Sequence, residues 1–579
     1  MENSGNIEKA AADIVSRRIP EQEHSTSRRE IFRRIPSIAA VTLASAAVPM
    51  ISPAEATEPT GSPDSANKRA AASFKIRLDA AQEEAELPAP QQIANGDEQK
   101  YPNFIGNYHK GLQHNGIGEV EPTAYQAFLN AVHRGTWDAF ESIPLGGGQK
   151  LVNPLAGQAF DLEGTDSHKL AIDPFPSVAS RDLADQAVEL YWMALCRDVN
   201  FLDYGSDKLG LTKAAAAELT SLKRFKGPQV NGAVTPQTLF RGFTAGDAIG
   251  PYVSQFLLKS FAYGPYAMNG TMGMYTPGLD YMTDVKSWLA VQNGQGPFAQ
   301  NTIDATRYTC TGRDLCVYVH SDPNAGLLIS FYNAGIWLFE QNAPLNPGNP
   351  YTKYKNQAGF ATFGVPHFLC LLGEAKQRAC KAAWYSKWFV HRALRPEAYG
   401  GLMQMKATKI RPTFPLHDAV LSSQGLATVF SNKGASLLYL LPQAFPEGSP
   451  QHPSYPQGHA TMAGACATIL KAAFDGSVAF NTLGDKRIVT ASADGLSLVD
   501  YTGSDASQIT VNGEIEKLAS NIGQARDFAG IHWRSDYEWG LKLGEAAALS
   551  VLRDQSNIYA GEDFEGFEIT TFDGENMIA

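Results

Sequence analysis

Apolar residues recur every three or four positions along much of the chain, a spacing that places them on one face of an α-helix. The clearest segments predict helices over 181–199, 211–225, 378–394, 459–474 and 536–555. Alternating segments typical of strands are few, and RIVTAS (487–492) is one of them. The pattern therefore predicts a mainly α fold, with one large helical-bundle domain, few short strands, and an active site between facing helices.

The first 56 residues differ from the rest. A twin arginine, Arg28-Arg29, precedes a modest apolar stretch over 38–51, and Ala54-Glu55-Ala56 offers a small-residue cleavage site. This arrangement resembles a bacterial twin-arginine export signal. The alternative is a membrane anchor, but the stretch is shorter than the roughly 20 apolar residues that span a bilayer. We expect an exported protein, periplasmic or extracellular, without stable membrane insertion.

Composition divides the remaining chain into three parts. Residues 57–100 are rich in Ala, Glu, Pro and Gln and are expected to form a partly disordered linker. Residues 101–555 have an even composition with no repeat or linker, as expected for one catalytic domain. Residues 556–579 form an acidic C-terminal tail.

The net charge of −11 and the pI near 5.6 argue against nucleic acid as a partner, because a protein that binds it needs a basic surface. Any bound anion must therefore be held by local cations. Of the six cysteines, Cys310 and Cys316 could form a disulfide in an oxidising compartment. The spacing of the cysteines fits no zinc site.

The first segment with candidate chemistry is KWFVHRALRPEAYGG, which holds Lys387 and Arg395. They are eight positions apart, about 12 Å of rise in a straight helix. Their long side chains could still bracket one small anion. Pro396 is expected to stop the helix and bend the chain. The alternative is a Lys/Arg pair on a solvated helix face.

The second segment is QHPSYPQGHATMAG, which places Gly458 and His459 at the start of a predicted helix. The unpaired N–H groups and the positive dipole at a helix N-terminus favour an anion. A glycine lets that anion approach the backbone closely. His459 can act as an acid or base near neutral pH. The alternative is an N-terminal turn with a structural histidine.

The third segment is ARDFAGIHWRSDYEWG, in which Gly530 interrupts a helix between Arg526 and His532. A new helix is expected after His532, capped by Ser535 or Asp536. Asp536 could also orient the His532 ring. The alternative is a set of surface charges on amphipathic helices.

Together the three segments supply two arginines, one lysine, two histidines and a helix N-terminus. This set suits a highly charged tetrahedral or trigonal oxyanion. It contains neither the carboxylate cluster that Mg²⁺ or Ca²⁺ prefers nor a Cys/His set for Zn²⁺.

The order Lys–x7–Arg-Pro, Pro-x-Gly-His and Arg–x5–His–x3–Asp resembles the vanadium-dependent haloperoxidases and the related type 2 acid phosphatases. Seven residues between Lys and Arg resemble the bromoperoxidases of marine algae and cyanobacteria. Further similarity lies at 104–120, 150–170, 328–344 and 359–369, so that it covers roughly residues 101–555. The resemblance implies the helical-bundle fold of that family, a vanadate (V5+) cofactor, and a homo-oligomer, dimeric or larger.

The resemblance also implies residue roles. His532 would bond the vanadium, and the vanadate oxygens would be held by Lys387, Arg395, Gly458 and Arg526. His459 would help deprotonate hydrogen peroxide, and Lys387 would polarise the bound peroxide. The halide would leave as hypohalous acid, which halogenates small organic acceptors.

Three further positions bear on halide preference and cofactor affinity. The resemblance makes His452 and Trp384 the halide-side wall of an enzyme that prefers bromide and iodide, and accepts chloride weakly if at all. For Trp384 the alternative is a core aromatic residue. Gln457 stands where the family has a serine that donates its hydroxyl to the oxyanion. Its longer amide could reach the vanadate, turn away or crowd the halide.

The main hypothesis is thus a vanadium-dependent bromide peroxidase. Two alternatives share the same residues. In a phosphatase on this scaffold, His532 would form a phosphohistidine and His459 would protonate the leaving alcohol. In the other alternative, Gln457 has impaired catalysis and left an exported oxyanion-binding oligomer.

Overall fold

The computed structural model describes residues 66–101, 103–296, 298, 301–320, 328–432, 438–559 and 561–579. The export signal expected over 1–56 lies outside these residues. The chain divides into two compact units, 1–75 and 76–579. The three candidate segments lie in the second unit.

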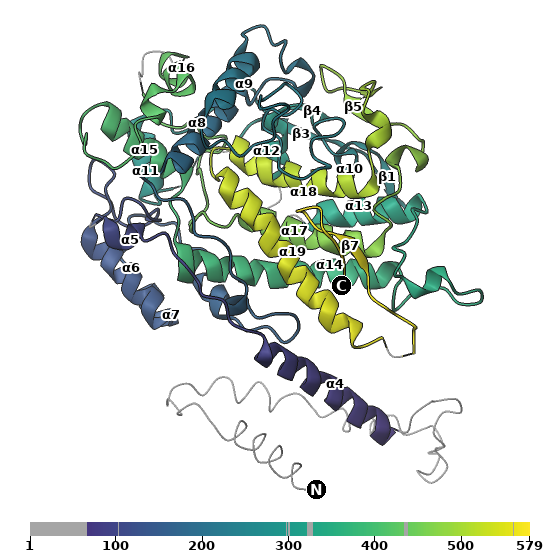
Figure 1. The fold of residues 1–579 in the computed structure, drawn as a ribbon. Coiled ribbons are helices and arrows are strands. Elements are labelled where there is room, and N and C mark those ends of the chain that lie inside the picture. Colours follow the sequence, from purple (N-terminus) through teal and green to yellow (C-terminus); the bar gives the residue numbers. More distant parts are fainter. Residues whose placement is uncertain are drawn as a thin grey trace, which may run out of the picture. The chain divides into compact units, whose positions relative to one another are not determined.

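Helices dominate the described residues (Figure 1), which confirms the predicted fold class. Their bounds are α4 Ala66–Glu86, α5 Asp97–Lys100, α6 Pro122–Arg134, α7 Trp137–Glu141, α8 Arg181–Cys196, α9 Leu211–Ser221, α10 Gln255–Leu258, α11 Val285–Gln292, α12 Gly312–His320, α13 Leu328–Glu340, α14 Val365–Tyr385, α15 Pro396–Ala407, α16 Gln424–Asn432, α17 Gly458–Ala473, α18 Val511–Phe528 and α19 Arg534–Ser556. All five helices predicted from periodicity are present.

The strands are short and pair antiparallel in four two-stranded sheets: β1 with β2, β3 with β4, β5 with β6, and β7 with β8. Their bounds are β1 Phe261–Tyr263, β2 Tyr266–Met268, β3 Thr271–Tyr275, β4 Ile303–Tyr308, β5 Val489–Ala491, β6 Leu498–Asp500, β7 Glu568–Thr570 and β8 Asn576–Ile578. β5 falls within the strand predicted at 487–492.

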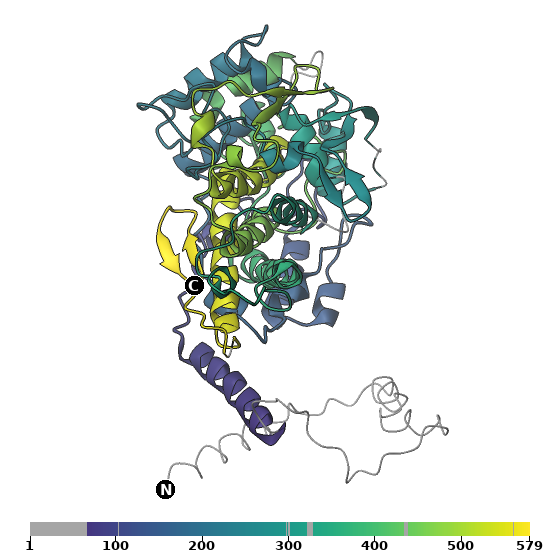
Figure 2. The ribbon, with the colours of Figure 1, turned by 90° about the vertical axis from the view of Figure 1, so that its right-hand side faces the viewer.

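The core of the second unit is built on α17, which packs against α14, α18 and α19. Figure 2 shows helices of this bundle close to end-on. Small residues dominate α17, and nearly all of its positions are buried. Such a helix can be approached closely from several sides, so α17 holds its neighbours at short distances.

Glycines set the closest approach, which is between α17 and α19. A Cβ atom on Gly464 would clash with the backbone carbonyl of Leu541, and one on Gly544 would clash with the carbonyl of Thr461. His532 lies just before α19, and Gly458 opens α17. The glycine contacts therefore also fix the distance between two of the three candidate segments.

The path from Lys387 to Arg395 differs from the predicted one. α14 continues into a π-helical turn over Ser386–His391, and Arg392 then adopts a left-handed backbone with φ of 41°. Pro396 does not stop the preceding helix but occupies the first turn of α15, where its missing N–H costs no hydrogen bond. Lys387 and Arg395 thus do not share one straight helix.

The expected linker and the acidic tail both contain regular structure. Within 57–100, α4 and α5 are helical, and Glu84 accepts a hydrogen bond from the Asp166 amide at 3.1 Å. In the tail, β7 and β8 form a hairpin whose Phe567 and Ile569 are buried. Lys471 of α17 donates to the Thr570 carbonyl at 2.8 Å. The hairpin is therefore attached to the central helix.

Cys310 and Cys316 do not form the disulfide that their spacing allowed. The Cys310 thiol points to the Asp314 carboxylate, and the Cys316 thiol donates to the Ala525 carbonyl of α18 at 3.2 Å. Cys316 lies within α12 and faces another helix, so the two thiols are held apart. Within the described residues, no helix has the length and apolar character needed to cross a membrane.

The close contact between α17 and α19 gives a stability prediction. Gly544→Ala should lower the free energy of unfolding by about 1–3 kcal/mol, because the added methyl overpacks the interface. The control is Gly373→Ala in α14, where a Cβ would meet open space; it should stabilise by up to about 1 kcal/mol through helix propensity. Urea unfolding measures both. Equal effects of the two variants would contradict the account of this interface.

Candidate functional site

The three segments singled out in the sequence meet in one buried site. Arg395 of the first segment donates to His532 Nε2 of the third at 2.8 Å. A Cβ on Gly458 of the second would lie 3.0 Å from Trp384 and 3.8 Å from the Lys387 side chain. Residues more than a hundred positions apart are thereby brought into contact.

Lys387 lies in the π-helical turn and is completely buried. Its Nζ donates to the carbonyls of Pro453 at 2.9 Å and Ser454 at 2.6 Å. An ammonium group has three N–H donors. Two therefore fix the side chain, and the third remains for an anion.

Arg395 precedes α15 and connects the other two segments. Its Nε and one terminal nitrogen donate to the His452 carbonyl at 3.0 and 2.9 Å. The other terminal nitrogen donates to the Ile531 carbonyl at 2.9 Å as well as to His532. Each of the three guanidinium nitrogens therefore donates to a protein acceptor.

Asp536 fixes the orientation of His532. Its Oδ2 accepts from His532 Nδ1 at 2.7 Å, from the Trp533 amide at 3.1 Å and from the Ser454 hydroxyl. A carboxylate accepts a proton donor, which assigns the ring proton to Nδ1. His532 Nε2 therefore presents a lone pair to the site. Asp536 sits in the first turn of α19 and so also helps to cap that helix, as the sequence predicted.

Arg526, near the end of α18, is bound differently from the other two cations. Its guanidinium lies 5.5 Å over the Phe445 ring. The Nε atom is buried, and no acceptor for it exists among the residues that the structure describes. A buried donor without an acceptor is costly. Arg526 thus has a hydrogen bond to offer that the described protein does not use.

The start of α17 offers backbone donors. No acceptor occurs in the described part of the chain for the amides of Gly458, His459 and Ala460, which are the orphan N–H groups of a helix N-terminus. The His459 ring points the other way, with Nε2 3.4 Å from the Val319 carbonyl at the end of α12. Its Nδ1 is then the free ring nitrogen.

Gln457 turns away from this N-terminus. Its Nε2 donates to the Gly523 carbonyl of α18 at 3.0 Å, and its side chain makes no hydrogen bond that caps α17. Of the orientations that the sequence left open, the structure has the one in which the amide points to a neighbouring helix.

His452 and Trp384 pack together at one side of the site. Their ring centroids are 4.9 Å apart and the ring planes lie at 41°. The Trp384 indole donates to the Val152 carbonyl at 3.1 Å. Trp384 is only partly buried, whereas His452 is buried. The pair lies between the buried cations and the more exposed surface.

Burial of like charges shapes the electrostatics. Lys387, Arg395 and Arg526 are 0%, 1% and 5% exposed. Burial and the neighbouring Arg395 lower the pKa of Lys387 well below its usual value, and lower that of Arg526 to about 10. Burial lowers the pKa of Arg395 to about 10 and raises that of Asp536 to about 6. Each shift favours less charge, so a bound anion would stabilise the charged cations.

Apart from Asp536, which is bonded to His532, the nearby carboxylates are paired with other groups or favour the neutral acid. Glu397, two residues after Arg395, is ion paired with Lys110 at 2.6 Å. Glu447 is paired with His320 at 2.6 Å. Burial raises the pKa of Asp527 well above its usual value, which favours the neutral acid. The geometry and the charge together describe a site for a small, highly charged oxyanion beside an imidazole lone pair.

Comparisons with known proteins agree with this chemistry. A family model described as "VCPO second helical-bundle domain" matches residues 367–561. A vanadium-dependent bromoperoxidase of Ascophyllum nodosum is 34% identical over 533 residues, covering 89% of this chain and 93% of the relative. One of Corallina officinalis is 33% identical, covering 89% of this chain and 99% of the relative. The chain belongs to the vanadium-dependent bromoperoxidase family.

The fold agrees with the family as well. The structure of the second vanadate-dependent bromoperoxidase from Ascophyllum nodosum, described as homohexameric, matches with a TM-score of 0.83 and 30% identity. The match covers 93% of this chain and 95% of that one. The family resemblance stated from the sequence motifs is therefore confirmed.

Several groups in this bromoperoxidase-family site were not found from the sequence. Pro453 and Ser454 accept from Lys387 through their carbonyls, and Val319 approaches His459 in the same way. Backbone carbonyls have no side-chain signature, so no sequence signal could reveal them. The Ser454 hydroxyl lies inside the second motif and could have been considered. Phe445 lies in no motif and has no such signal.

The three histidines of the site, of which His452 and His532 are buried and His459 is partly buried, give a pH prediction. Burial, followed by the nearby cations, lowers the pKa of His452, His459 and His532 well below 6.5. The unfolded chain protonates these rings below about pH 6.5 while the folded protein does not, so stability should fall with acidification. His452→Gln should make the slope shallower by about 1.4 kcal/mol per pH unit.

Urea unfolding between pH 7 and 5, without added oxyanion, measures this slope. The control is His133→Gln on the exposed surface of α6, which should leave the slope unchanged. If the free energy of unfolding of His452→Gln has the same pH dependence as that of the parent, the His452 ring is not buried in its neutral state.

Proposed function

We propose that this protein is a vanadate-dependent peroxidase that oxidises bromide and iodide with hydrogen peroxide. The product is hypohalous acid, which halogenates small organic acceptors. The observation that carries the proposal is the buried set of Lys387, Arg395 and Arg526 around the lone pair of His532 Nε2. The names of the relatives, which are vanadium-dependent bromoperoxidases, support the same halide and cofactor.

The residues present fit a vanadate oxyanion. Donors without a protein acceptor are the Arg526 Nε, the third N–H of Lys387 and the first amides of α17. Gly458 has no side chain, so an anion can approach its amide in the space where a Cβ would contact Trp384. His532 Nε2 supplies a nitrogen ligand, held in place by Asp536. A tetrahedral anion of high charge would satisfy all of these groups at once.

Bound vanadate would supply a Lewis acid that activates peroxide without changing its own oxidation state. The protein would supply position and charge. His532 Nε2 would hold the metal, and the Arg395 N–H that donates to that atom would then be available to an oxygen of the anion. Lys387 and Arg526 would stabilise the negative charge in a buried site, where fixed donors are most effective.

His459 is suited to act as the base for peroxide. Burial and the nearby Arg526 lower the pKa of its imidazole well below 6.5, so the ring is neutral near pH 7 and carries a free lone pair. The negative charge of a bound oxyanion would offset the Arg526 charge and so strengthen the ring as a base. Its Nε2 faces the Val319 carbonyl, which leaves Nδ1 for the proton. Oxidation of one halide consumes one peroxide and one proton and yields hypohalous acid and water.

His452 and Trp384 would form the halide side of the site. The Arg395 N–H directed at His452 Nδ1, at 3.1 Å, keeps positive charge next to the ring pair. An anionic halide would be favoured there, and the aromatic faces would provide a polarisable surface. This arrangement supports a preference for the larger, softer bromide and iodide.

Export and assembly are parts of the same proposal. The twin arginine Arg28-Arg29, the apolar stretch and the Ala54-Glu55-Ala56 site support export in the folded state to the periplasm or beyond. The Ascophyllum nodosum relative of similar fold is described as homohexameric, which supports a homo-oligomer here.

A vanadate-dependent bromination assay tests the activity. Full-length protein loaded with orthovanadate should brominate a phenolic dye when given bromide and peroxide. His532→Ala should reduce the rate by at least about a hundredfold, because it removes the metal ligand. The control is His367→Ala in α14, whose ring contacts the Phe363 amide and Tyr559 outside this site. That variant should keep the parental rate.

The same samples given a chromogenic phosphate ester separate the alternatives. Ester hydrolysis that vanadate inhibits, without bromination, would support the phosphatase. Absence of both bromination and ester hydrolysis would support an oxyanion-binding protein without catalytic activity. Bromination by His532→Ala at the parental rate would contradict the assignment of the metal ligand.

Gln457 provides a second test of the vanadate site. Gln457→Ser should tighten orthovanadate binding, because it adds a hydroxyl donor beside Gly458. It should also cost about 1 kcal/mol of stability, since the Gly523 carbonyl loses its partner. Gln457→Ala is the matched control: it loses the same bond without adding a hydroxyl, and its affinity should equal that of the parent. Equal binding by the Ser and Ala variants, measured calorimetrically, would count against a hydroxyl contact.

A further inference from the structure

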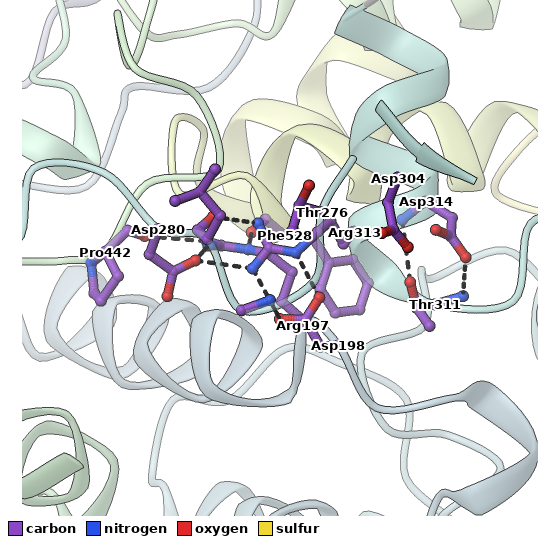
Figure 3. Close-up of polar contacts among 12 residues, drawn as sticks. Arg197, Asp198, Thr276, Asp280, Asp304, Thr311, Arg313, Asp314, Pro442 and Phe528 are labelled. Carbon is purple, nitrogen blue, oxygen red and sulfur yellow. Dashed lines mark hydrogen bonds and ion pairs between the residues drawn. The ribbon is translucent and has the colours of Figure 1, made fainter. Parts of the chain in front are cut away.

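Arg197, which follows α8 as its C-terminal cap residue, is a completely buried arginine outside the site. Figure 3 shows its guanidinium between three groups. Its Nε donates to the Phe528 carbonyl at 2.7 Å, and one terminal nitrogen donates to the Pro442 carbonyl at 3.0 Å. The other terminal nitrogen pairs with Asp280 at 2.6 Å. A single side chain thus connects three separate segments.

Two of these segments hold the two members of the Arg526–Phe445 stack. Phe528 is the last residue of α18 and lies two positions after Arg526. Pro442 lies three positions before Phe445, whose ring is 5.5 Å from the Arg526 guanidinium. The Arg197 guanidinium therefore fixes the backbone on both sides of that stack.

Other contacts keep the same two segments together. The Ala444 amide donates to the Ala529 carbonyl at 3.1 Å. Gly530 has φ of 81°, and a Cβ there would lie 2.7 Å from the Gln443 side chain. On the other side of α18, the Cys316 thiol donates to the carbonyl of Ala525. The end of α18 is thereby fixed just before the chain reaches His532.

A second buried arginine, Arg313, shares Asp280 with Arg197. Arg313 donates to Asp280 at 3.0 Å and to Asp198 at 2.8 Å, as Figure 3 shows. It also donates to the Leu279 carbonyl at 2.6 Å. The Arg313 amide also donates to the Arg197 carbonyl at 2.8 Å. Two arginines and two aspartates balance in charge, so this cluster can stay rigid without a bound ion.

Arg526, unlike Arg197, is not fixed by hydrogen bonds from its own guanidinium to the described protein. The Nε of Arg526 has no acceptor among the described residues, so its position depends on its backbone and on the Phe445 ring. We propose that Arg197 is a positioning residue that sets Arg526 against Phe445, so that the Arg526 guanidinium meets the bound oxyanion. The inference rests on the proposed vanadate site. It assigns Arg197 no contact with the cofactor or substrates.

Calorimetric titration of orthovanadate into the full-length vanadate-free protein tests this role. Arg197→Lys keeps the charge, but an ammonium group cannot span both carbonyls and Asp280 with the fork of a guanidinium. We expect it to weaken orthovanadate binding about tenfold. In an Arg526→Ala background, Arg197→Lys should weaken binding no further, because residues that act through one group are not additive.

Arg313→Lys is the matched control. Arg313 is nearly as buried and belongs to the same cluster, but it bonds neither Phe528 nor Pro442. It should lose stability to a similar degree and bind orthovanadate within about twofold of the parent. A purely structural role for the cluster would instead affect both lysine variants alike.

Two results would overturn the inference. One is parental affinity in Arg197→Lys, and the other is equal weakening by this substitution with and without Arg526. If Arg197→Lys does not fold, Arg197→Gln replaces it. The Gln amide can still reach a carbonyl, and Asp280 stays paired with Arg313. Arg197→Gln should likewise weaken binding no further in the Arg526→Ala background. Absence of binding by the parent would refute the proposed vanadate site itself, and the inference with it.

Discussion

The burial of three like charges around one imidazole is the constraint on which the rest of the site depends. Lys387, Arg395 and Arg526 are almost completely excluded from solvent, and their pKa values are shifted toward the neutral forms. Such an arrangement is unfavourable in isolation and becomes favourable when an oxyanion is bound. The bundle supplies the rigidity that keeps the cations in place without that anion.

Backbone groups hold most of the cations in place. Carbonyls hold Lys387 and Arg395, so these donors are fixed without carboxylates that would cancel their charge. Close glycine contacts between α17 and α19 bring the Gly458 amide near His532. The donors left without a protein acceptor then define where the anion binds. The specificity of the site follows from which hydrogen bonds the fold leaves unmade.

The sequence predicted five of the helices, and it predicted three segments that the structure brings together, because both have local signatures. Helical periodicity identified α8, α9, α17 and α19, and the motif order identified the lysine, arginines and histidines. The sequence did not predict the path of the backbone from Lys387 to Arg395. A π-helical turn and a left-handed Arg392 have no recognisable sequence pattern. The orientation of Gln457 and the link from Arg197 to the end of α18 depend on carbonyls of distant segments, which no side-chain pattern records.

A crystal structure of the full-length protein loaded with orthovanadate, with the vanadium located by its anomalous signal, tests the central claim most directly. The account predicts vanadium bonded to His532 Nε2, with its oxygens accepting from Arg526 and the Gly458 amide. It also predicts that Arg395 no longer donates to His532. Vanadium bound elsewhere, or an intact Arg395–His532 hydrogen bond beside it, would contradict the account.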